Sequence, residues 1–518
     1  MNKKGGGPQG PPLFLVPSRK LTMPVAQATV MFAPPDHKRP LALTRADVKV
    51  VGVLAGFTLI VRGVWFGDPN ADIDEQLYSL IGSAMLEGKV PFVDLWDRKP
   101  WGLFALFALA HALGGPGPLA YQALAAVFTL AGAVMTFVLA RPLAARWTAA
   151  GAGLLTVVLA ALYGAHSANS EVFFIPMMLA MAALVRDPDH PRARLRALAA
   201  MLIGGTALQI KYTVLPQSLF FGLWALWGEY RCGSRPARLA GQAALFGLLG
   251  LLPTALVGAG YALAGHGDAF VFANFLSFFD RLPSGAGRLH GPIVMLLLPL
   301  LGVALLGLNA ARRRPAHERR SHAFHGLWLA AALATVFLPS TVYGYYLAAL
   351  IPPCVLLALP LFARKDPAVF NPLIMAPAVL FLALLPSHYS LAQDSRAAAG
   401  RMAAAIAPHV DGERRCLLVF DGPTALYRLS GSCLPSRFVY PDHLNNALER
   451  NALGIRQEHE VARILAARPP VIVIADTPLT PQNPAALGLV RAAIARDYRP
   501  LAVEKFHKRT VRAFVLRT

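Results

Sequence analysis

One segment of the chain holds both acidic and basic side chains that could transfer a proton beside a bound phosphate. Asp74 and Glu75 are followed by Tyr78, and Arg98 and Lys99 come later in the same segment. An ionised carboxylate in the first turn of a helix is stabilised by the helix dipole and can act as a general base or orient a hydroxyl group. Two cations just before a helix start favour a phosphate. The pattern therefore indicates proton abstraction next to a phosphate group.

These residues also have simpler structural explanations. Asp72 with Glu75 three residues later fits a capping box, in which both side chains serve only to start a helix. Arg98 and Lys99 could contact lipid headgroups without selectivity. Asp74 is not needed for the cap, and we therefore regard its carboxylate as the candidate for proton transfer.

Further ionisable and aromatic residues stand at the edges of apolar runs. Glu171 opens one run and Lys211 closes another. Ionisable residues at the edge of apolar segments usually just extend to the membrane interface, but a carboxylate that begins a span is less often without function than a lysine. A loop over 265–290 and a later tyrosine cluster add residues that could bind a sugar or a phosphate, while a belt of aromatic side chains at the membrane interface is the alternative. The residues in question are Asn274, Arg281, Arg288, Tyr345 and Tyr346.

The composition indicates the class of protein to which these residues belong. Of the 518 residues, 55% are hydrophobic and only 15% are charged, with a mean hydropathy of +0.48. A soluble globular protein has about a quarter charged residues, so the class of soluble enzymes is excluded. The formal net charge is +21, but the basic residues lie between apolar runs, and we expect no nucleic-acid partner. The sequence predicts a polytopic α-helical membrane protein.

Apolar runs of a length that spans a bilayer recur after the first 47 residues, and we predict about eleven spans. Lys and Arg concentrate in every second loop, which places those loops and the N-terminus in the cytoplasm and the C-terminus outside. The predicted spans are 48–66, 118–140, 147–164, 171–185, 196–211, 213–228, 239–264, 291–309, 323–339, 343–362 and 369–386.

Two shorter helices are expected in the first outer loop. Apolar residues from Ile73 to Met85 recur at helical spacing and predict an amphipathic helix on the membrane surface. The run from Trp101 to Leu113 is too short to span, and counting it as a span would invert every basic loop after it. We therefore expect both helices to lie at the outer interface, with all the candidate residues on that same face.

Three domains follow from the changes in composition along the chain. Residues 1–47 are rich in Gly, Pro and basic residues and predict a disordered cytoplasmic tail, 48–390 form the membrane domain, and 391–518 form a small α/β domain outside the membrane. Strands are expected at 416–420 and 471–475, and a hairpin at 500–517. Cys416 and Cys433 both belong to the outer domain, and a disulfide between them is a hypothesis suited to an oxidising compartment.

The spacing of these residues resembles a known family. Asp74-Glu75-x-x-Tyr78, then Met85-Leu86-x-Gly88 and Asp97-x-Lys99-Pro100, is similar to the first outer loop of GT-C glycosyltransferases. The branches it resembles are Rgt-type galacturonosyltransferases, lipid A aminoarabinose transferases and protein O-mannosyltransferases. Looser matches follow in order at Ser170-Glu171-x-Phe173, Leu208-x-x-Lys211 and Tyr345-Tyr346.

The resemblance implies an inverting glycosyltransferase of the bacterial inner membrane that uses a polyprenyl-phosphate-linked sugar and a glycan or lipid acceptor of the cell envelope. Asp74 would be the catalytic base, Glu75 and Glu171 further acidic residues of the site, and Lys99 with Lys211 the ligands of the donor phosphate. It implies no cofactor, and the sequence shows no cluster of metal ligands. A secondary transporter, or an oligosaccharide ligase or polymerase of the same fold, remains the alternative.

Overall fold

The computed structural model describes residues 43–285, 288–362 and 371–517. Most of the predicted tail lies outside these residues. Its last residues form a short 3-10 helix, η1 (Arg45–Asp47), which leads directly into α2. The carboxylate of Asp47 is buried there in ion pairs with Arg141 and Arg146, and it therefore joins the start of the chain to the end of α5 and the start of α6.

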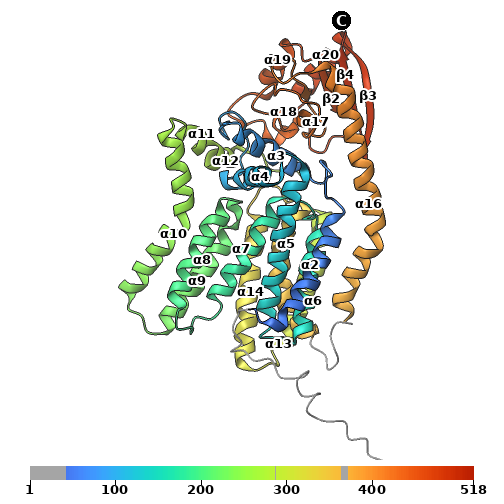
Figure 1. Ribbon diagram of the computed structural model, residues 1–518. Helices are drawn as coiled ribbons and strands as arrows, with labels where there is room; N and C mark the ends of the chain where they lie inside the picture. Colours follow the sequence, from blue (N-terminus) through green and yellow to red (C-terminus); the bar gives the residue numbers. More distant parts are fainter. Residues whose placement is uncertain (1–42, 286–287, 363–370, 518) are drawn as a thin grey trace, which may run out of the picture.

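A bundle of long helices makes up most of the molecule, and each of the eleven segments predicted to span the membrane is helical (Figure 1). The helices are α2 (Val48–Gly63), α5 (Pro118–Ala140), α6 (Arg146–Leu162), α7 (Ser170–Val185), α8 (Ala193–Leu208), α9 (Leu215–Arg231), α10 (Pro236–Leu263), α13 (Gly291–Ala311), α14 (Ala316–Phe337), η4 (Gly344–Leu350) with α15 (Ile351–Phe362), and α16 (Pro372–Ile406).

Five continuous helical segments of the described chain are long and apolar enough to cross a membrane, and three shorter helices are also apolar. The five are Pro118–Ala140, Pro236–Leu263, Gly291–Ala311, Gly344–Phe362 and Pro372–His409. The molecule is thus a membrane protein, while the number of spans and their direction stay predictions. Segment 363–370, which includes one predicted basic loop, lies outside the described residues.

Two shorter helices lie across one end of the bundle, between it and the C-terminal part of the chain (Figure 1). They are α3 (Ile73–Leu86) and α4 (Trp101–Gly114), the two helices predicted for the first outer loop. They cross closely at Gly82, where any Cβ would come within 2.8 Å of the backbone nitrogen of Ala108. Leu103, Phe104 and Phe107 are fully buried on the inner side of α4. Burial of these side chains stabilises α4 against the bundle, and α3 is held in place because it packs on α4.

The loop between α10 and α13 contributes three short helical pieces to the same end of the molecule. They are α11 (Gly267–Val271), the π-helical turn η3 (Phe272–Leu276) and α12 (Ser277–Asp280), while the short 3-10 helix η2 (Tyr212–Val214) joins α8 to α9. Figure 1 shows α11 and α12 beside α3 and α4. One aromatic residue of this loop packs against the bundle: Phe270 is buried and stacked on Tyr261 of α10, with the ring centroids 5.4 Å apart.

The C-terminal residues form a four-stranded sheet with helices around it. The sheet order is β1-β2-β4-β3, with β1 parallel to β2 and the other pairs antiparallel. The strands are β1 (Leu418–Val419), β2 (Val471–Ala475), β3 (Tyr498–Phe506) and β4 (Arg509–Leu516). The helices are η6 (Ala407–His409), α17 (Leu426–Leu429), α18 (Pro441–Asn445), η7 (Ala447–Glu449), α19 (Gln457–Ala466) and α20 (Pro484–Asp497). A small C-terminal unit with a sheet was expected from the sequence. We call it the outer domain because it lies at one end of the molecule (Figure 1), and the side of the membrane on which it lies stays a prediction.

The outer domain is joined to the rest of the protein through its own core. Trp96, from the loop between α3 and α4, packs with Leu418, Phe420 and Phe438, and its backbone N–H donates to the carbonyl of Arg437 at 2.9 Å. Helix α16 runs from the bundle into this domain (Figure 1). Within the domain a disulfide joins Cys416 to Cys433, the pair that the sequence suggested.

Candidate active site

The Asp74 carboxylate is the centre of a polar cluster between the bundle and the outer domain. The hydroxyl of Tyr345 donates to its Oδ2 at 3.0 Å, and the hydroxyl of Tyr440 donates to its Oδ1 at 3.1 Å. The ammonium group of Lys99 lies 3.8 Å from Oδ2. The Asp74 side chain keeps 21% of its surface exposed, so the carboxylate can be reached from outside the protein.

Helix α3 begins in a way that presents Asp74 to this cluster. The side chain of Asp72 is the N-cap and accepts hydrogen bonds from the backbone N–H groups of Asp74 at 2.9 Å and Glu75 at 3.4 Å. The Glu75 carboxylate does not complete a capping box, because it contacts other elements instead. Asp72 alone therefore starts the helix, and the side chains of Asp74 and Glu75 remain available for other contacts.

The surroundings of Asp74 keep its carboxyl group ionised. Burial alone would raise its pKa, but the charge of Lys99 and the hydrogen bonds from Tyr345 and Tyr440 outweigh this effect and lower the pKa below the usual aspartate value. Other charged groups whose fields reach it are Lys211, Asp72, Asp97 and Asp442. An ionised carboxylate with partial exposure can accept a proton from a hydroxyl group or orient it.

Lys99 stands between two carboxylates at the start of α4. Its ammonium group donates to the hydroxyl of Tyr78 at 2.7 Å and lies 5.1 Å from the centroid of that ring. Burial lowers its pKa, but the charges of Asp74 and Asp97 more than compensate, so the pKa of Lys99 is raised and the side chain stays charged. This places a fixed, partly exposed cation beside Asp74, where an anionic group could bind.

A second cation lies close to the first. Lys211 forms an ion pair with Glu171, and both side chains are buried. Its ammonium group sits 3.7 Å from the ring centroid of Tyr346 and 5.7 Å from that of Tyr345. The hydroxyl of Ser170 donates to Glu171 at 2.9 Å. Tyr345 thus touches both Asp74 and the Lys211 pair, and the structure brings these predicted residues into one site.

Glu75 lies in a different environment from Asp74. It is fully buried, its Oε1 accepts from Gln122 at 3.2 Å, and its Oε2 accepts from the backbone N–H of Ala168 at 2.7 Å. Burial raises the pKa of Glu75 to about 7, although hydrogen bonds from Ser167, Ala168 and Gln122 oppose the shift. These contacts tie α3 to α5 and to the start of α7.

Two of the predicted arginines contact the outer domain, whereas the third arginine and Asn274 contact other parts of the chain. Arg98 and Arg281 both contact the carboxylate of Glu449, while Arg288 donates to the carbonyl of Pro339 at 2.8 Å. Asn274 accepts from the hydroxyl of Tyr212 at 3.0 Å. Arg98 and Arg281 are therefore near the Asp74 cluster but form ion pairs with Glu449. Arg288 and Asn274 form hydrogen bonds elsewhere in the membrane part, with Pro339 and Tyr212.

Two residues of the outer domain belong to this region but were not expected from the sequence. Tyr440 reaches Asp74, and Glu449 pairs with both arginines. Neither residue stands in a motif: Tyr440 directly precedes α18, and Glu449 ends the three-residue helix η7. Across the part of the chain that the structure describes, no group of three or more His, Cys, Asp and Glu side chains is arranged to hold a metal ion.

Two solved structures share the fold over most of the chain. ArnT from Cupriavidus metallidurans, bound to undecaprenyl phosphate, aligns with a TM-score of 0.59 at 18% sequence identity, covering 91% of this chain and 98% of ArnT. Its apo state aligns with the same TM-score at 17% identity, covering 90% of this chain and 98% of ArnT. The chain therefore shares the fold of ArnT, which agrees with the fold that the resemblance to GT-C glycosyltransferases implied.

A more distant structure also aligns. The archaeal oligosaccharyltransferase AglB from Archaeoglobus fulgidus, in complex with an inhibitory peptide and a dolichol-phosphate, gives a TM-score of 0.47 at 11% identity, covering 83% of this chain and 69% of AglB. No protein-family model and no curated protein matches the sequence.

Proposed function

We propose that this protein is an inverting glycosyltransferase that moves a sugar from a polyprenyl-phosphate donor to an acceptor of the cell envelope. The observation that carries the proposal is the Asp74 carboxylate, kept ionised by two tyrosine hydroxyls and placed beside the ammonium group of Lys99. A base and a phosphate-binding cation side by side are what transfer from a sugar phosphate requires.

The chemistry is a single displacement. The Asp74 carboxylate takes the proton of an acceptor hydroxyl as its oxygen attacks the anomeric carbon of the sugar. The bond from that carbon to the phosphate oxygen breaks, and the polyprenyl phosphate leaves with the electron pair. Lys99 and Lys211 stabilise the charge that develops on the leaving phosphate. Attack opposite the leaving group inverts the anomeric centre.

The remaining candidate residues support these two functions. Glu171 holds Lys211 through its ion pair, and Tyr78 holds Lys99 through a hydrogen bond. Tyr345 and Tyr346 line the space between Asp74 and Lys211, since each ring contacts the Lys211 ammonium group. Glu75 ties α3 to α5 and α7, and through that contact it fixes the direction in which Asp74 points.

The location of the site is consistent with a lipid-linked donor. Asp74 belongs to α3, which Figure 1 shows between one end of the helix bundle and the outer domain. The alternation of basic loops in the sequence supports a location of this end on the outer face of a bacterial inner membrane, with the outer domain in the periplasm. ArnT, which has the same fold, was captured with undecaprenyl phosphate. We infer a polyprenyl-phosphate sugar as donor and an envelope glycan or lipid as acceptor.

A donor-selection experiment tests the proposal. The full-length protein in detergent is given radiolabelled sugars on polyprenyl phosphate, or the same sugars on a nucleoside diphosphate, together with a membrane-lipid extract. We expect label to move only from the polyprenyl-phosphate donors, to a lipid or glycan product. Transfer from nucleotide sugars alone would contradict the proposal. Solute uptake by proteoliposomes, without consumption of any donor, would favour a transporter instead.

A further inference from the structure

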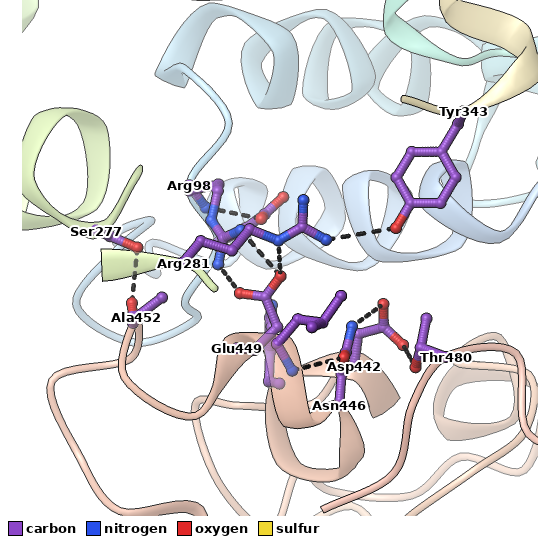
Figure 2. A network of polar contacts seen from close by, with 12 residues as sticks. Arg98, Ser277, Arg281, Tyr343, Asp442, Asn446, Glu449, Ala452 and Thr480 are labelled. Carbon is purple, nitrogen blue, oxygen red and sulfur yellow. Dashed lines mark hydrogen bonds and ion pairs between the residues drawn. The ribbon is translucent and has the colours of Figure 1, made fainter. Parts of the chain in front are cut away.

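A buried carboxylate of the outer domain contacts two cations from two different outer loops of the membrane part. Glu449 ends the short helix η7, and its Oε1 accepts from Arg98 at 3.0 Å and from Arg281 at 2.6 Å, while its Oε2 accepts a second bond from Arg98 (Figure 2). Such an arrangement is directional, because a guanidinium group binds a carboxylate in a fixed geometry.

The local sequence holds Glu449 firmly in place. Asn446 is the N-cap of η7 and accepts from the backbone N–H of Leu448 at 3.0 Å, and its amide donates to Asp442 at 3.2 Å. Asp442 also accepts from the hydroxyl of Thr480 at 3.0 Å (Figure 2). The carboxylate that meets the arginines is thus part of a fixed turn of the outer domain.

Each arginine connects Glu449 to the surroundings of Asp74 through one or two further residues. Arg98 directly precedes Lys99, whose ammonium group lies 3.8 Å from the Asp74 carboxylate. Arg281 donates to the hydroxyl of Tyr343 at 3.4 Å, and the ring of Tyr343 is stacked on that of Tyr345 with the planes 11° apart and the centroids 5.8 Å apart. Tyr345 in turn donates to Asp74.

The charge on Glu449 is needed where it stands. Burial raises its pKa, but Arg98 and Arg281 outweigh this effect, so the pKa lies below the usual glutamate value and the group stays ionised. Without that charge, two mostly buried guanidinium groups would face each other unpaired, and both would tend to move toward solvent. Movement of Arg98 would displace Lys99, and movement of Arg281 would release Tyr343.

Other contacts at this junction involve the backbone and do not depend on the Glu449 charge. The hydroxyl of Ser277 donates to the carbonyl of Ala452 at 2.6 Å (Figure 2), and the backbone N–H of Leu282 donates to the carbonyl of Leu448 at 2.9 Å. These contacts keep the outer domain attached when the charge is removed. The effect of losing the Glu449 ion pairs can therefore be measured while the outer domain stays attached to the membrane part.

We propose that Glu449 is a positioning residue through which the outer domain completes the active site. It fixes Arg98 and Arg281, and through them it holds Lys99 and Tyr345 in place around Asp74. The outer domain thus takes part in the transfer reaction without contributing the base. This inference rests on the proposed function for its kinetic test, and it also has a structural test that needs no activity.

The kinetic test compares Glu449→Gln with Glu449→Asp in the full-length protein. The matched control is Glu504→Gln, which removes a different ion pair, between Glu504 of β3 and Arg401 of α16. We expect kcat to fall about 10–100-fold in Glu449→Gln, the cost of a misplaced catalytic group. The acid limb of the pH profile should also move to higher pH, because Asp74 loses part of the field of Lys99. Glu449→Asp should restore the profile.

The structural test follows hydrogen–deuterium exchange of the backbone in the same variants. In Glu449→Gln we expect faster exchange at 72–78 and at 343–350, and in Glu504→Gln no change at either segment. Faster exchange confined to 277–282 and 446–452 would overturn the inference, as would a wild-type kcat and pH profile in Glu449→Gln. If the wild type uses no polyprenyl-phosphate donor, the proposed function fails and the exchange result alone decides this inference.

Discussion

The hydroxyl of Tyr440 lies 3.1 Å from the Asp74 carboxylate, although 366 positions of sequence separate the two residues. Tyr440 belongs to the outer domain and Asp74 to the helix that lies across the end of the bundle. The surroundings of the candidate base are therefore formed both by the membrane part and by the outer domain. The outer domain therefore belongs to the site itself, and its removal would change the electrostatics of Asp74.

Removing the Tyr440 hydroxyl should reduce activity without unfolding the protein. In Tyr440→Phe, Asp74 loses one of two hydrogen bonds that favour its charged form, and a hydrogen bond to a charged group contributes about 1.5–3 kcal/mol. We expect kcat/KM to fall about tenfold or more, and Tyr345→Phe to behave similarly. Tyr389→Phe, at an exposed tyrosine of α16, is the control. Wild-type kinetics in Tyr440→Phe would exclude this role.

The charge of Lys99 should control use of the donor phosphate. In Lys99→Gln the cation beside Asp74 is lost, so we expect a higher KM for the donor and a lower kcat, since stabilisation of the leaving phosphate is also lost. Initial rates at varied donor concentration measure both. The exposed Lys89 of the same loop offers the control variant Lys89→Gln. Equal effects in the two variants would indicate a general surface-charge effect instead of a phosphate site.

The ionisation of Glu75 should make stability depend on pH. Its pKa is raised from 4.5 to about 7 by burial, so the protonated form is favoured by folding. The stability that this group contributes is fully present below pH 4.5 and is lost as the pH rises through about 7. We expect the Tm of the wild type, relative to Glu75→Gln, to fall over that window in thermal denaturation. A constant difference would show that Glu75 is ionised throughout.

Replacing one residue of the Lys211–Glu171 ion pair should destabilise the protein more than replacing both. Both side chains are buried, so Lys211→Met leaves an uncompensated carboxylate, a loss of about 3–5 kcal/mol in other buried pairs. We expect a lower Tm in Lys211→Met and a partial recovery in the double variant with Glu171→Gln. The recovery should not extend to activity, because the second cation is still missing. Full activity in the double variant would remove Lys211 from the donor site.

Much of the membrane part could be predicted because its signals are local. The helix expected at 118–140 is found over those residues, and the two short helices of the first outer loop were visible from apolar spacing and from a run too short to span. Asp74, Lys99, Glu171 and Lys211 could also be placed on one face. Glu171 and Lys211 stand at the edges of apolar runs, and Asp74 and Lys99 lie in the long charged loop over 67–99. The alternation of basic loops assigns both the edges and this loop to one side.

The contribution of the outer domain could not be predicted from the sequence. Tyr440 directly precedes the short helix α18 and Glu449 ends the short helix η7, and both reach their partners only through the packing of the outer domain against α3 and the loops around it. Such long-range packing leaves no periodic signal in the sequence. The partner of Arg98 and Arg281 was missed for the same reason, since a pair of cations in a sequence gives no indication of a distant carboxylate.

The most direct test of the central claim replaces the Asp74 carboxylate by an amide of the same shape. Asp74→Asn is compared with the wild type and with Glu87→Gln, an exposed carboxylate at the other end of α3. The readout is transfer of radiolabelled sugar from polyprenyl phosphate in folded, detergent-purified protein. The account predicts full transfer by the wild type and Glu87→Gln, and a loss of at least about 100-fold in Asp74→Asn. Equal transfer by Asp74→Asn would contradict it.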